Sequence, residues 1–157
     1  MDASKSQGSQ ANYTGRILQE FIEARLRECG YSYMSQASFR ESRSPAQAAY
    51  TRQCDIGPGI YGTPLKADYV LFHPAKWPEL LAIEAKWQQA AGSVDEKYPY
   101  LEHNIKQCYP CPAVILLDGR GFKPGAAEWL RKQVDGRKLL HVFDMAQFTA
   151  WANQGHL

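Results

Sequence analysis

The sequence predicts a single α/β domain in which a mixed β-sheet is flanked by helices. Helical and strand-like segments follow one another in the order α, β, β, β, α, β, α, β, α, which is typical of a sheet covered by helices. The 157 residues suit one domain, and 45% of them are hydrophobic, enough for a core without disulfides or structural metal. We therefore expect a folded domain over residues 13–157, preceded by a disordered Ser/Gln-rich tail over residues 1–12.

Apolar residues at three- and four-residue spacing mark the helices. Gly30 is a natural stop for the first of them. Ahead of the second, Ser93 and Glu96 have the spacing of a capping box, and Pro99 suits a first helical position. The helices are expected over about residues 15–29, 99–107, 124–134 and 146–152.

The strands are short apolar runs bounded by turn residues. Gly57, Pro58 and Gly59 mark a turn after the first strand, and the short connection HPAKWPE between the second and third predicts an antiparallel hairpin. The run AVILL is apolar throughout, which indicates a strand covered on both faces. Residues 31–48 indicate only a weak strand or a loop. The strands are expected over residues 49–56, 65–72, 80–87, 113–117 and 139–143.

Composition excludes several classes of protein. Four cysteines in a chain of this length do not form a disulfide scaffold. Cys108 and Cys111 close a helix instead of opening one, and no further ligands with zinc spacing accompany them. No apolar run approaches the about 20 residues that a membrane-spanning helix needs, and the polar N-terminus is not a signal peptide. We therefore expect no membrane partner and a cytoplasmic location.

Charged residues stand at unexpected places in two apolar strands. Glu84, Lys86 and Gln88 share one face of their strand, because alternate residues point the same way. Asp68 is embedded in the preceding strand, KADYVLF. Burying such charges is costly unless they are paired or hold a metal. An antiparallel hairpin would bring Asp68 beside Glu84.

This arrangement suits a divalent cation. Two carboxylates on adjacent strands offer the hard oxygen ligands that Mg²⁺ or Mn²⁺ prefers, and the Ala85 carbonyl between them could be a further ligand. Such an ion activates water for attack on a phosphodiester. Lys86 would orient or deprotonate that water, or neutralise charge on the phosphorus.

Glu-x-Lys alone is a weak signal, because Asp95-Glu96-Lys97 also matches D-x-K, at a helix start. The context carries the argument: an acid in an apolar strand, a short hairpin, an apolar strand that ends in E-x-K, then a helix. The plainer interpretation is a surface salt bridge at the end of a hairpin. The apolar surroundings disfavour it, since exposed strands alternate more cleanly.

These segments resemble the PD-(D/E)XK nuclease superfamily, which includes many restriction endonucleases and phage, repair and recombination nucleases. TGRILQEFIEARLRECGY resembles that fold's first helix, and KADYVLF with LLAIEAKWQ resembles its catalytic hairpin. GSVDEKYPYLEHNI and PAVILLDGRGFKPGAAEWL resemble the helix, strand and helix that follow. The resemblance implies the restriction-endonuclease-like α-β-β-β-α-β core and, as in small phage and restriction-locus nucleases, a prokaryotic or phage-infected cell.

Two positions depart from the superfamily pattern. Ala67 precedes Asp68 where the motif often has proline. The first helix offers Gln19 where a glutamate is expected, with Glu20 beside it and Glu23 one turn on. Either acid is a candidate auxiliary group, and which of them faces the site is left open; both also suit a solvent-facing helix surface.

The resulting functional hypothesis is a Mg²⁺-dependent DNA endonuclease that uses metal-activated water. Asp68 and Glu84 are the expected metal ligands, and Lys86 is the expected water-activating or charge-neutralising group. Gln88 and Glu20 are expected auxiliary residues. Candidate nucleic-acid contacts, each equally compatible with ordinary surface or packing roles, are Lys97, Tyr98, Arg120 and Lys123.

A chain this short has little room for a separate recognition domain. We therefore expect a homodimer, a partner protein, or recognition of DNA structure. The rival hypotheses are a resolvase or exonuclease of the same fold, a catalytically inert DNA-binding member, and a plain structural or interaction domain. DNA and RNA are not distinguished by the sequence.

Overall fold

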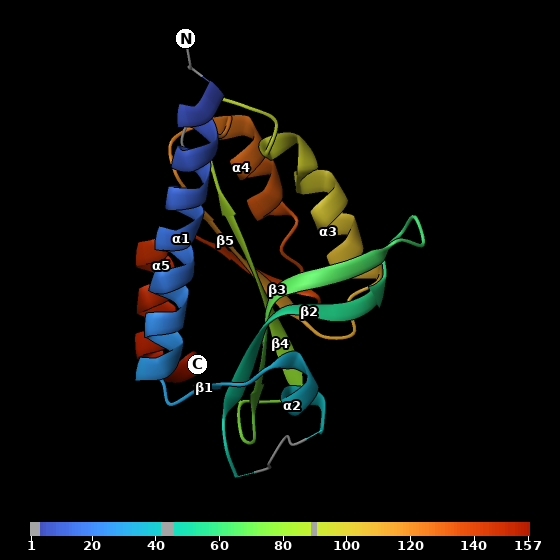
Figure 1. Ribbon diagram of the computed structural model, residues 1–157. Helices are drawn as coiled ribbons and strands as arrows, with labels where there is room; N and C mark the ends of the chain where they lie inside the picture. Colours follow the sequence, from blue (N-terminus) through green and yellow to red (C-terminus); the bar gives the residue numbers. More distant parts are fainter. Residues whose placement is uncertain (1–3, 42–45, 89–90) are drawn as a thin grey trace.

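The computed structural model describes the backbone of residues 4–41, 46–88 and 91–157, and the side chains from Gly15 onward within those ranges. A six-stranded sheet forms its centre, and helices pack on both sides of it (Figure 1). The strands are β1 (Ser32–Tyr33), β2 (Ala49–Pro58), β3 (Pro64–His73), β4 (Trp77–Trp87), β5 (Ala113–Asp118) and β6 (Leu139–Phe143). The helices are α1 (Ser4–Glu28), α2 (Gln36–Glu41), η1 (Asp95–Lys97), α3 (Tyr98–Gln107), α4 (Pro124–Lys132), α5 (Met145–Trp151) and η2 (Ala152–His156).

The sheet is mixed, as the sequence predicts. Its strands lie in sequence order from β1 to β6. β2, β3 and β4 form an antiparallel meander, whereas β4, β5 and β6 run parallel and β1 runs parallel to β2. The parallel half needs helical crossovers, and α3 and α4 supply them between β4 and β6. This confirms the predicted α/β class with a mixed sheet flanked by helices.

Each face of the sheet has its own core. α1 and α5 cover one face, where Leu18, Ile22 and Phe148 pack against residues such as Ile83. α3 and α4 cover the other face, where their apolar side chains pack around Ile115. The β5 strand is buried along nearly its whole length, which confirms the prediction from its continuous apolar run.

The antiparallel and parallel halves separate at the end of β4. The β3–β4 ladder has its last pair at Tyr69 and Ile83. β4 continues beyond this point beside β5, as far as the pair between Trp87 and Asp118. The last residues of β4 therefore have a strand partner on only one side, and the candidate site lies at this divergence.

The N-terminal third differs most from the predicted elements. α1 begins at Ser4, well before the predicted start near residue 15, and so enters the segment expected to be a disordered tail. Residues 1–3 lie outside the described residues. Within 31–48 the chain forms β1 and α2, and residues 42–45 again lie outside the description. The six-residue α2 buries only Phe39, which is too little to show a helical period in sequence.

The predicted capping box at Ser93 is wrong. Val94 is the N-cap of η1, and no side chain caps that helix. The Glu96 N–H instead bonds the Ser93 carbonyl oxygen at 3.2 Å, so a turn takes the place of the cap. A capping box is present at α5, where the Asp144 and Gln147 side chains each bond the other's backbone N–H.

Candidate active site

Glu84 is a buried acid at the divergence of β3 and β4. Its side chain faces α3, since Ala82 before it belongs to the core on that face, and it is 2% exposed. The Tyr109 hydroxyl donates to Oε1 at 2.7 Å, and the Asp68 N–H donates to the same oxygen at 3.4 Å. Burial, followed by repulsion from Asp68, raises the pKa of Glu84 to about 7.

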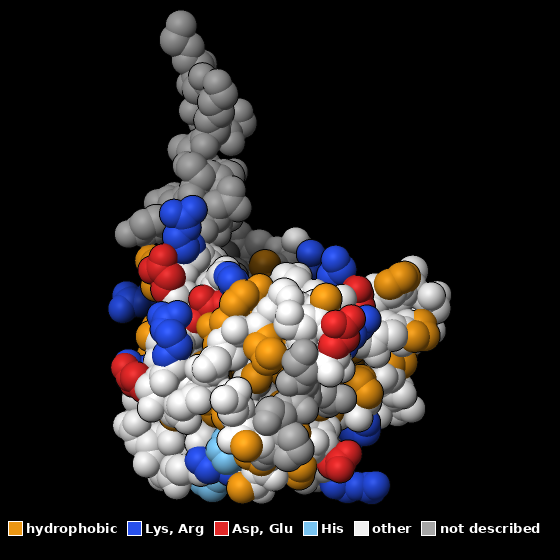
Figure 2. Space-filling model, turned by 60° about the horizontal axis from the view of Figure 1, so that its bottom comes forward, with side chains coloured by type: hydrophobic (Ala, Val, Ile, Leu, Met, Phe, Trp, Pro, Cys, Tyr) orange, Lys and Arg blue, Asp and Glu red, His pale blue; other side chains and the backbone are white. Residues whose placement is uncertain are grey.

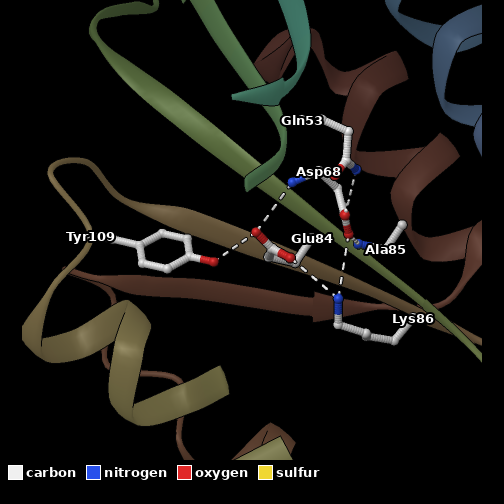
Figure 3. Close-up of polar contacts among 6 residues, drawn as sticks. All are labelled: Gln53, Asp68, Glu84, Ala85, Lys86 and Tyr109. Carbon is white, nitrogen blue, oxygen red and sulfur yellow. Dashed lines mark hydrogen bonds and ion pairs between the residues drawn. The ribbon is translucent and has the colours of Figure 1, made fainter. Parts of the chain in front are cut away.

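Asp68 lies beside Glu84 on the neighbouring strand, as Figure 3 shows. Its Oδ2 accepts the Ala85 N–H at 2.9 Å, and its Oδ1 accepts from Gln53 Nε2 at 3.1 Å. Because β3 and β4 no longer pair here, the Asp68 side chain takes the N–H of Ala85 that a strand partner would otherwise bond. The predicted meeting of Asp68 and Glu84 across the hairpin is thus present.

The Lys86 ammonium lies between the two acids (Figure 3). Nζ is 3.4 Å from Asp68 Oδ2 and 3.3 Å from Glu84 Oε2. These two oxygens are therefore no more than about 6.7 Å apart, the two distances laid end to end. Burial lowers the pKa of Lys86, but Glu84 and then Asp68 outweigh this effect, so the pKa lies above its ordinary value and the side chain is charged.

The backbone of Ala85 points toward the same place. The N–H groups of Ala82 and Gln88 bond to Pro112 and Asp118 on the β5 side. Alternate residues of a strand direct their N–H and C=O to opposite neighbours, so the odd-numbered residues of β4 face β3. Ala85 lies past the last β3–β4 pair, and its carbonyl is therefore directed toward the Asp68 side without a ladder partner.

The donor set fits a divalent cation. Two carboxylates and a strand carbonyl direct oxygen atoms to one region, and the buried, repelled Glu84 carboxylate gains from any cation placed beside it. Within the described part of the chain, no group of three or more His, Cys, Asp or Glu side chains could hold a metal. Sites with one or two carboxylates, completed by water and substrate phosphate, are typical of Mg²⁺.

Comparison with known proteins agrees with this geometry. A family model described as PD-(D/E)XK nuclease superfamily domain matches residues 10–156. The chain belongs to the PD-(D/E)XK nuclease superfamily. A search of curated proteins finds no match. The match spans nearly the whole chain, so the nuclease-type domain includes α1, the sheet and the C-terminal helices, and its substrate class is nucleic acid.

Gln88, expected as an auxiliary of this PD-(D/E)XK site, is used elsewhere. It is 5% exposed. Its Oε1 accepts the Asp95 N–H at 3.1 Å and its Nε2 donates to the Gly121 carbonyl at 3.0 Å. Both ends of the amide therefore hold loops together. Gly119 crosses so closely that a Cβ there would lie 2.2 Å from the Gln88 carbonyl oxygen, which requires glycine.

The acids of α1 do not join the carboxylate cluster. Glu20 is exposed. Glu23 is turned inward, with Oε1 3.1 Å from Arg52 Nε. The buried side chains of α1 pack on the sheet face opposite to that of Glu84. Of the two acids left open by the sequence, Glu23 is the one that faces the protein, but its partner is Arg52.

The candidate nucleic-acid residues divide into two groups. Lys97, Arg120 and Lys123 are exposed. Their segments meet at Gln88, because Asp95 bonds both Gln88 and the Lys123 N–H, the latter at 2.8 Å. Tyr98 is 1% exposed, so it packs in the core and presents no surface to a ligand.

Charge alone marks no nucleic-acid surface on the face drawn in Figure 2. Basic and acidic side chains are interspersed there among uncharged ones. This agrees with the small net charge of +2. No described helix is long and apolar enough to cross a membrane.

Gln53 and Tyr109 are site residues that the sequence does not reveal. Tyr109 is buried in the α3–β5 connection, and Gln53 lies on β2. They bond acids that are 25 and 15 positions away in sequence. No spacing pattern encodes such partners. A weak signal exists for Gln53 alone, since folding β2 and β3 about the predicted glycine turn places it near Asp68.

Proposed function

We propose that this PD-(D/E)XK domain is a Mg²⁺-dependent endonuclease that hydrolyses phosphodiester bonds of DNA. One observation carries the proposal: the Lys86 ammonium is 3.4 and 3.3 Å from two carboxylates that converge at a strand end. A surface salt bridge would leave its acid exposed, whereas Glu84 is 2% exposed. A buried acid that shares a lysine with a second, partly exposed acid is expected of a catalytic centre.

Each side chain of the centre has a role that follows from its contacts. Asp68 and Glu84 would hold the cation through their carboxylate oxygens, and the Ala85 carbonyl would be the third ligand from the protein. A divalent ion there supplies the positive charge that lowers the pKa of an attacking water and offsets charge on the phosphate. Mn²⁺ would substitute, because it accepts the same oxygen ligands.

Lys86 would act as an electrostatic group. Its pKa lies above the ordinary value, so the side chain enters the reaction charged. A fixed ammonium beside the attacked phosphorus stabilises charge that develops in the transition state. Action as a base would require the cation to lower that pKa when it binds beside the two acids.

Substrate contacts are proposed for the exposed Lys97, Arg120 and Lys123. They flank the Gln88 junction two residues beyond Lys86 in sequence, and basic side chains bind phosphates without reading sequence. Target choice is proposed to depend on a second copy, on a partner protein, or on DNA structure. Light scattering of the protein with and without duplex DNA measures which assembly forms.

The proposal is tested by incubating the protein with supercoiled plasmid in Mg²⁺, Mn²⁺ or EDTA. Nicked or linear products in either metal and none in EDTA are expected. The Asp68→Asn variant, purified in the same way, controls for contaminating nucleases. Absence of cleavage on plasmid, linear duplex, single strands and RNA, together with no Mn²⁺ binding by calorimetry, would refute the proposed activity.

Other outcomes separate the rival hypotheses. Degradation of linear DNA but not of closed circles would assign an exonuclease, and selective cutting of four-way junctions would assign a resolvase. DNA binding without cleavage, despite bound Mn²⁺, would favour an inert DNA-binding member. Cleavage of RNA alone would replace DNA as the substrate while leaving the catalytic assignment intact.

A further inference from the structure

Gln53 has an unusual backbone conformation next to the proposed metal ligands. Its φ is +48°, and among the described residues Leu80 is the other non-glycine residue with positive φ. Left-handed conformations cost free energy for residues with a Cβ and persist where the surrounding structure or the function requires them. Gln53 is exposed, so burial of its side chain does not offset this cost.

One consequence of this conformation concerns the strand alone. Ala49 and Cys54 both pack in the core on the α3 face, although they are five positions apart and regular alternation would place them on opposite faces. The left-handed Gln53 lies where the strand changes face, and β3 changes face beside it, because Ala67 and Val70 also share this core at three positions' spacing. Glycine or asparagine serves that purpose at lower cost, so the face switch accounts for the backbone but not for a glutamine side chain.

The side chain of Gln53 acts on Asp68. The strand pairs Arg52–Tyr69 and Cys54–Ala67 place Gln53 opposite Asp68, and its Nε2 donates to Asp68 Oδ1 at 3.1 Å (Figure 3). The other carboxylate oxygen, Oδ2, accepts from the Ala85 N–H and lies next to Lys86. With one oxygen held by Gln53, the rotation of the carboxylate is fixed and Oδ2 is directed toward the Ala85 N–H and Lys86.

We infer that Gln53 is a positioning residue that holds Asp68 in the orientation required for cation binding, and that the chain retains a strained backbone to supply it. The inference rests on the proposed function, because it assumes that Asp68 is a metal ligand. Groups that orient metal ligands typically change metal affinity about 10- to 100-fold when removed. We expect an effect in that range for Gln53.

The test is a set of three substitutions at this position. Gln53→Gly removes the side chain and suits positive φ, so the melting temperature of the metal-free protein should hold or rise, while Mn²⁺ affinity and the cleavage rate fall about tenfold or more. Gln53→Asn also suits this backbone but is one methylene short, and should behave similarly. Gln53→Met keeps the length without the donor, and should lose affinity without gaining stability.

Calorimetric titration with Mn²⁺ and thermal unfolding without metal give readouts that are independent of turnover. If Gln53 served only the backbone of β2, Gln53→Gly would be more stable and would bind Mn²⁺ like the wild type. That result would overturn the inference while leaving the proposed function intact. Failure of the wild type itself to bind Mn²⁺ or to cleave nucleic acid would instead refute the proposed function on which the inference rests.

Discussion

Two tripeptides of this chain match the same D/E-x-K pattern and have different environments. Glu84-Ala85-Lys86 lies at the end of a buried strand, whereas Asp95-Glu96-Lys97 forms the short helix η1. Both begin with a buried acid, since Glu84 is 2% and Asp95 4% exposed. The surroundings of these two acids, and not the motif itself, determine what each one can do.

The strand directs its acid and its lysine to the same point. Alternation places Glu84 and Lys86 on one face, and the parting of β3 from β4 brings in Asp68. Three charged groups then share one small volume. The pKa of Glu84 rises to about 7 there, which means that the site as built favours an additional positive charge.

The helix start uses its acid for backbone contacts. The Asp95 Oδ2 accepts the Lys123 N–H at 2.8 Å, and its own N–H donates to Gln88. Glu96 and Lys97 are exposed and point away from this bond network. Asp95 therefore joins two loops. A sequence motif of this kind acquires chemical meaning only when the backbone makes its side chains converge.

The largest difference between the two regions should appear on neutralising the acids of the strand site. Glu84→Gln or Asp68→Asn removes a proposed ligand and a charge, so cleavage should fall by at least about 10³-fold, more than the loss of a single electrostatic group. The metal-free protein should unfold at the same or a higher temperature, because repulsion between the acids is relieved. Single-turnover cleavage and thermal unfolding measure the two effects.

Glu79→Gln is the matched control, since Glu79 lies on the same strand and is exposed. It should leave both the rate and the metal dependence unchanged. Full activity in Glu84→Gln or Asp68→Asn would remove these residues from the catalytic centre.

The two lysines offer the next comparison. Lys86→Ala should slow single-turnover cleavage about 10²-fold with little change in DNA affinity, the scale expected for one preorganised electrostatic or proton-transfer group. Lys97→Ala should instead weaken binding modestly and leave the rate at saturation unchanged, because an exposed lysine contributes through phosphate contacts. Equal effects of the two substitutions would contradict the distinction drawn between the two regions.

Lys86→Arg separates the roles open to the strand lysine. Guanidinium is always charged and cannot accept a proton, and it is planar and bulkier than an ammonium. We expect it not to restore the rate. An arginine variant that cuts as fast as the wild type would exclude a base and leave a purely electrostatic role.

The pKa of Glu84 gives a smaller effect that depends on pH. The folded-state pKa of about 7 lies above the ordinary glutamate pKa of 4.5, so the folded metal-free protein binds more protons than the unfolded chain between these values. The contribution of Glu84 to stability is therefore fully present below about pH 4.5 and is lost as the pH rises through 7. Mn²⁺ affinity should show the reverse trend and fall up to about tenfold per unit below pH 7, because binding displaces the proton.

Glu84→Gln should abolish both trends. Calorimetric titration at several pH values and urea unfolding without metal are the measurements. A wild-type affinity that does not change between pH 5.5 and 8, a range on both sides of the Glu84 pKa of about 7, would show that this carboxyl does not titrate there.

Sequence alone sufficed where local pattern determines structure. Periodicity identified the strands and most helices, and the apolar context of Asp68 and Glu84 predicted that their hairpin joins them. Where the pattern was weak an element was missed, since residues 31–48 were expected to form a weak strand or a loop and contain the helix α2. The sequence also did not decide which acid of α1 faces the protein, because helical spacing allows either Glu20 or Glu23. Only the packing of α1 turns Glu23 inward.

Side-chain partners distant in sequence were beyond such prediction. The pattern grouped Gln88 with Glu84 and Lys86. It could not show that β4 ends at Trp87 and that two loops bond both ends of the Gln88 amide. For Tyr98 the sequence allowed both a surface and a packing role, and the structure buries it in the core. Gln53 and Tyr109 complete the site through bonds that depend on the relative placement of β2, β4 and the α3–β5 connection.

The smallest expected effects are those of substituting Asp95 and Glu96, the acids at the helix start. They test whether the second tripeptide takes no part in metal binding. Asp95→Ala leaves the partly buried Lys123 N–H without its acceptor, which should lower the free energy of unfolding by about 1 kcal/mol. Glu96→Ala should cost under about 0.5 kcal/mol, since Glu96 is exposed and makes no cap bond. Urea unfolding measures both. Neither variant should change Mn²⁺ affinity, because the Asp95 Oδ2 and backbone N–H bond Lys123 and Gln88, which are not proposed metal ligands. Loss of metal affinity in Asp95→Ala, with Glu84→Gln still binding Mn²⁺, would show that the cation binds at Asp95-Glu96-Lys97 and not at Glu84-Ala85-Lys86.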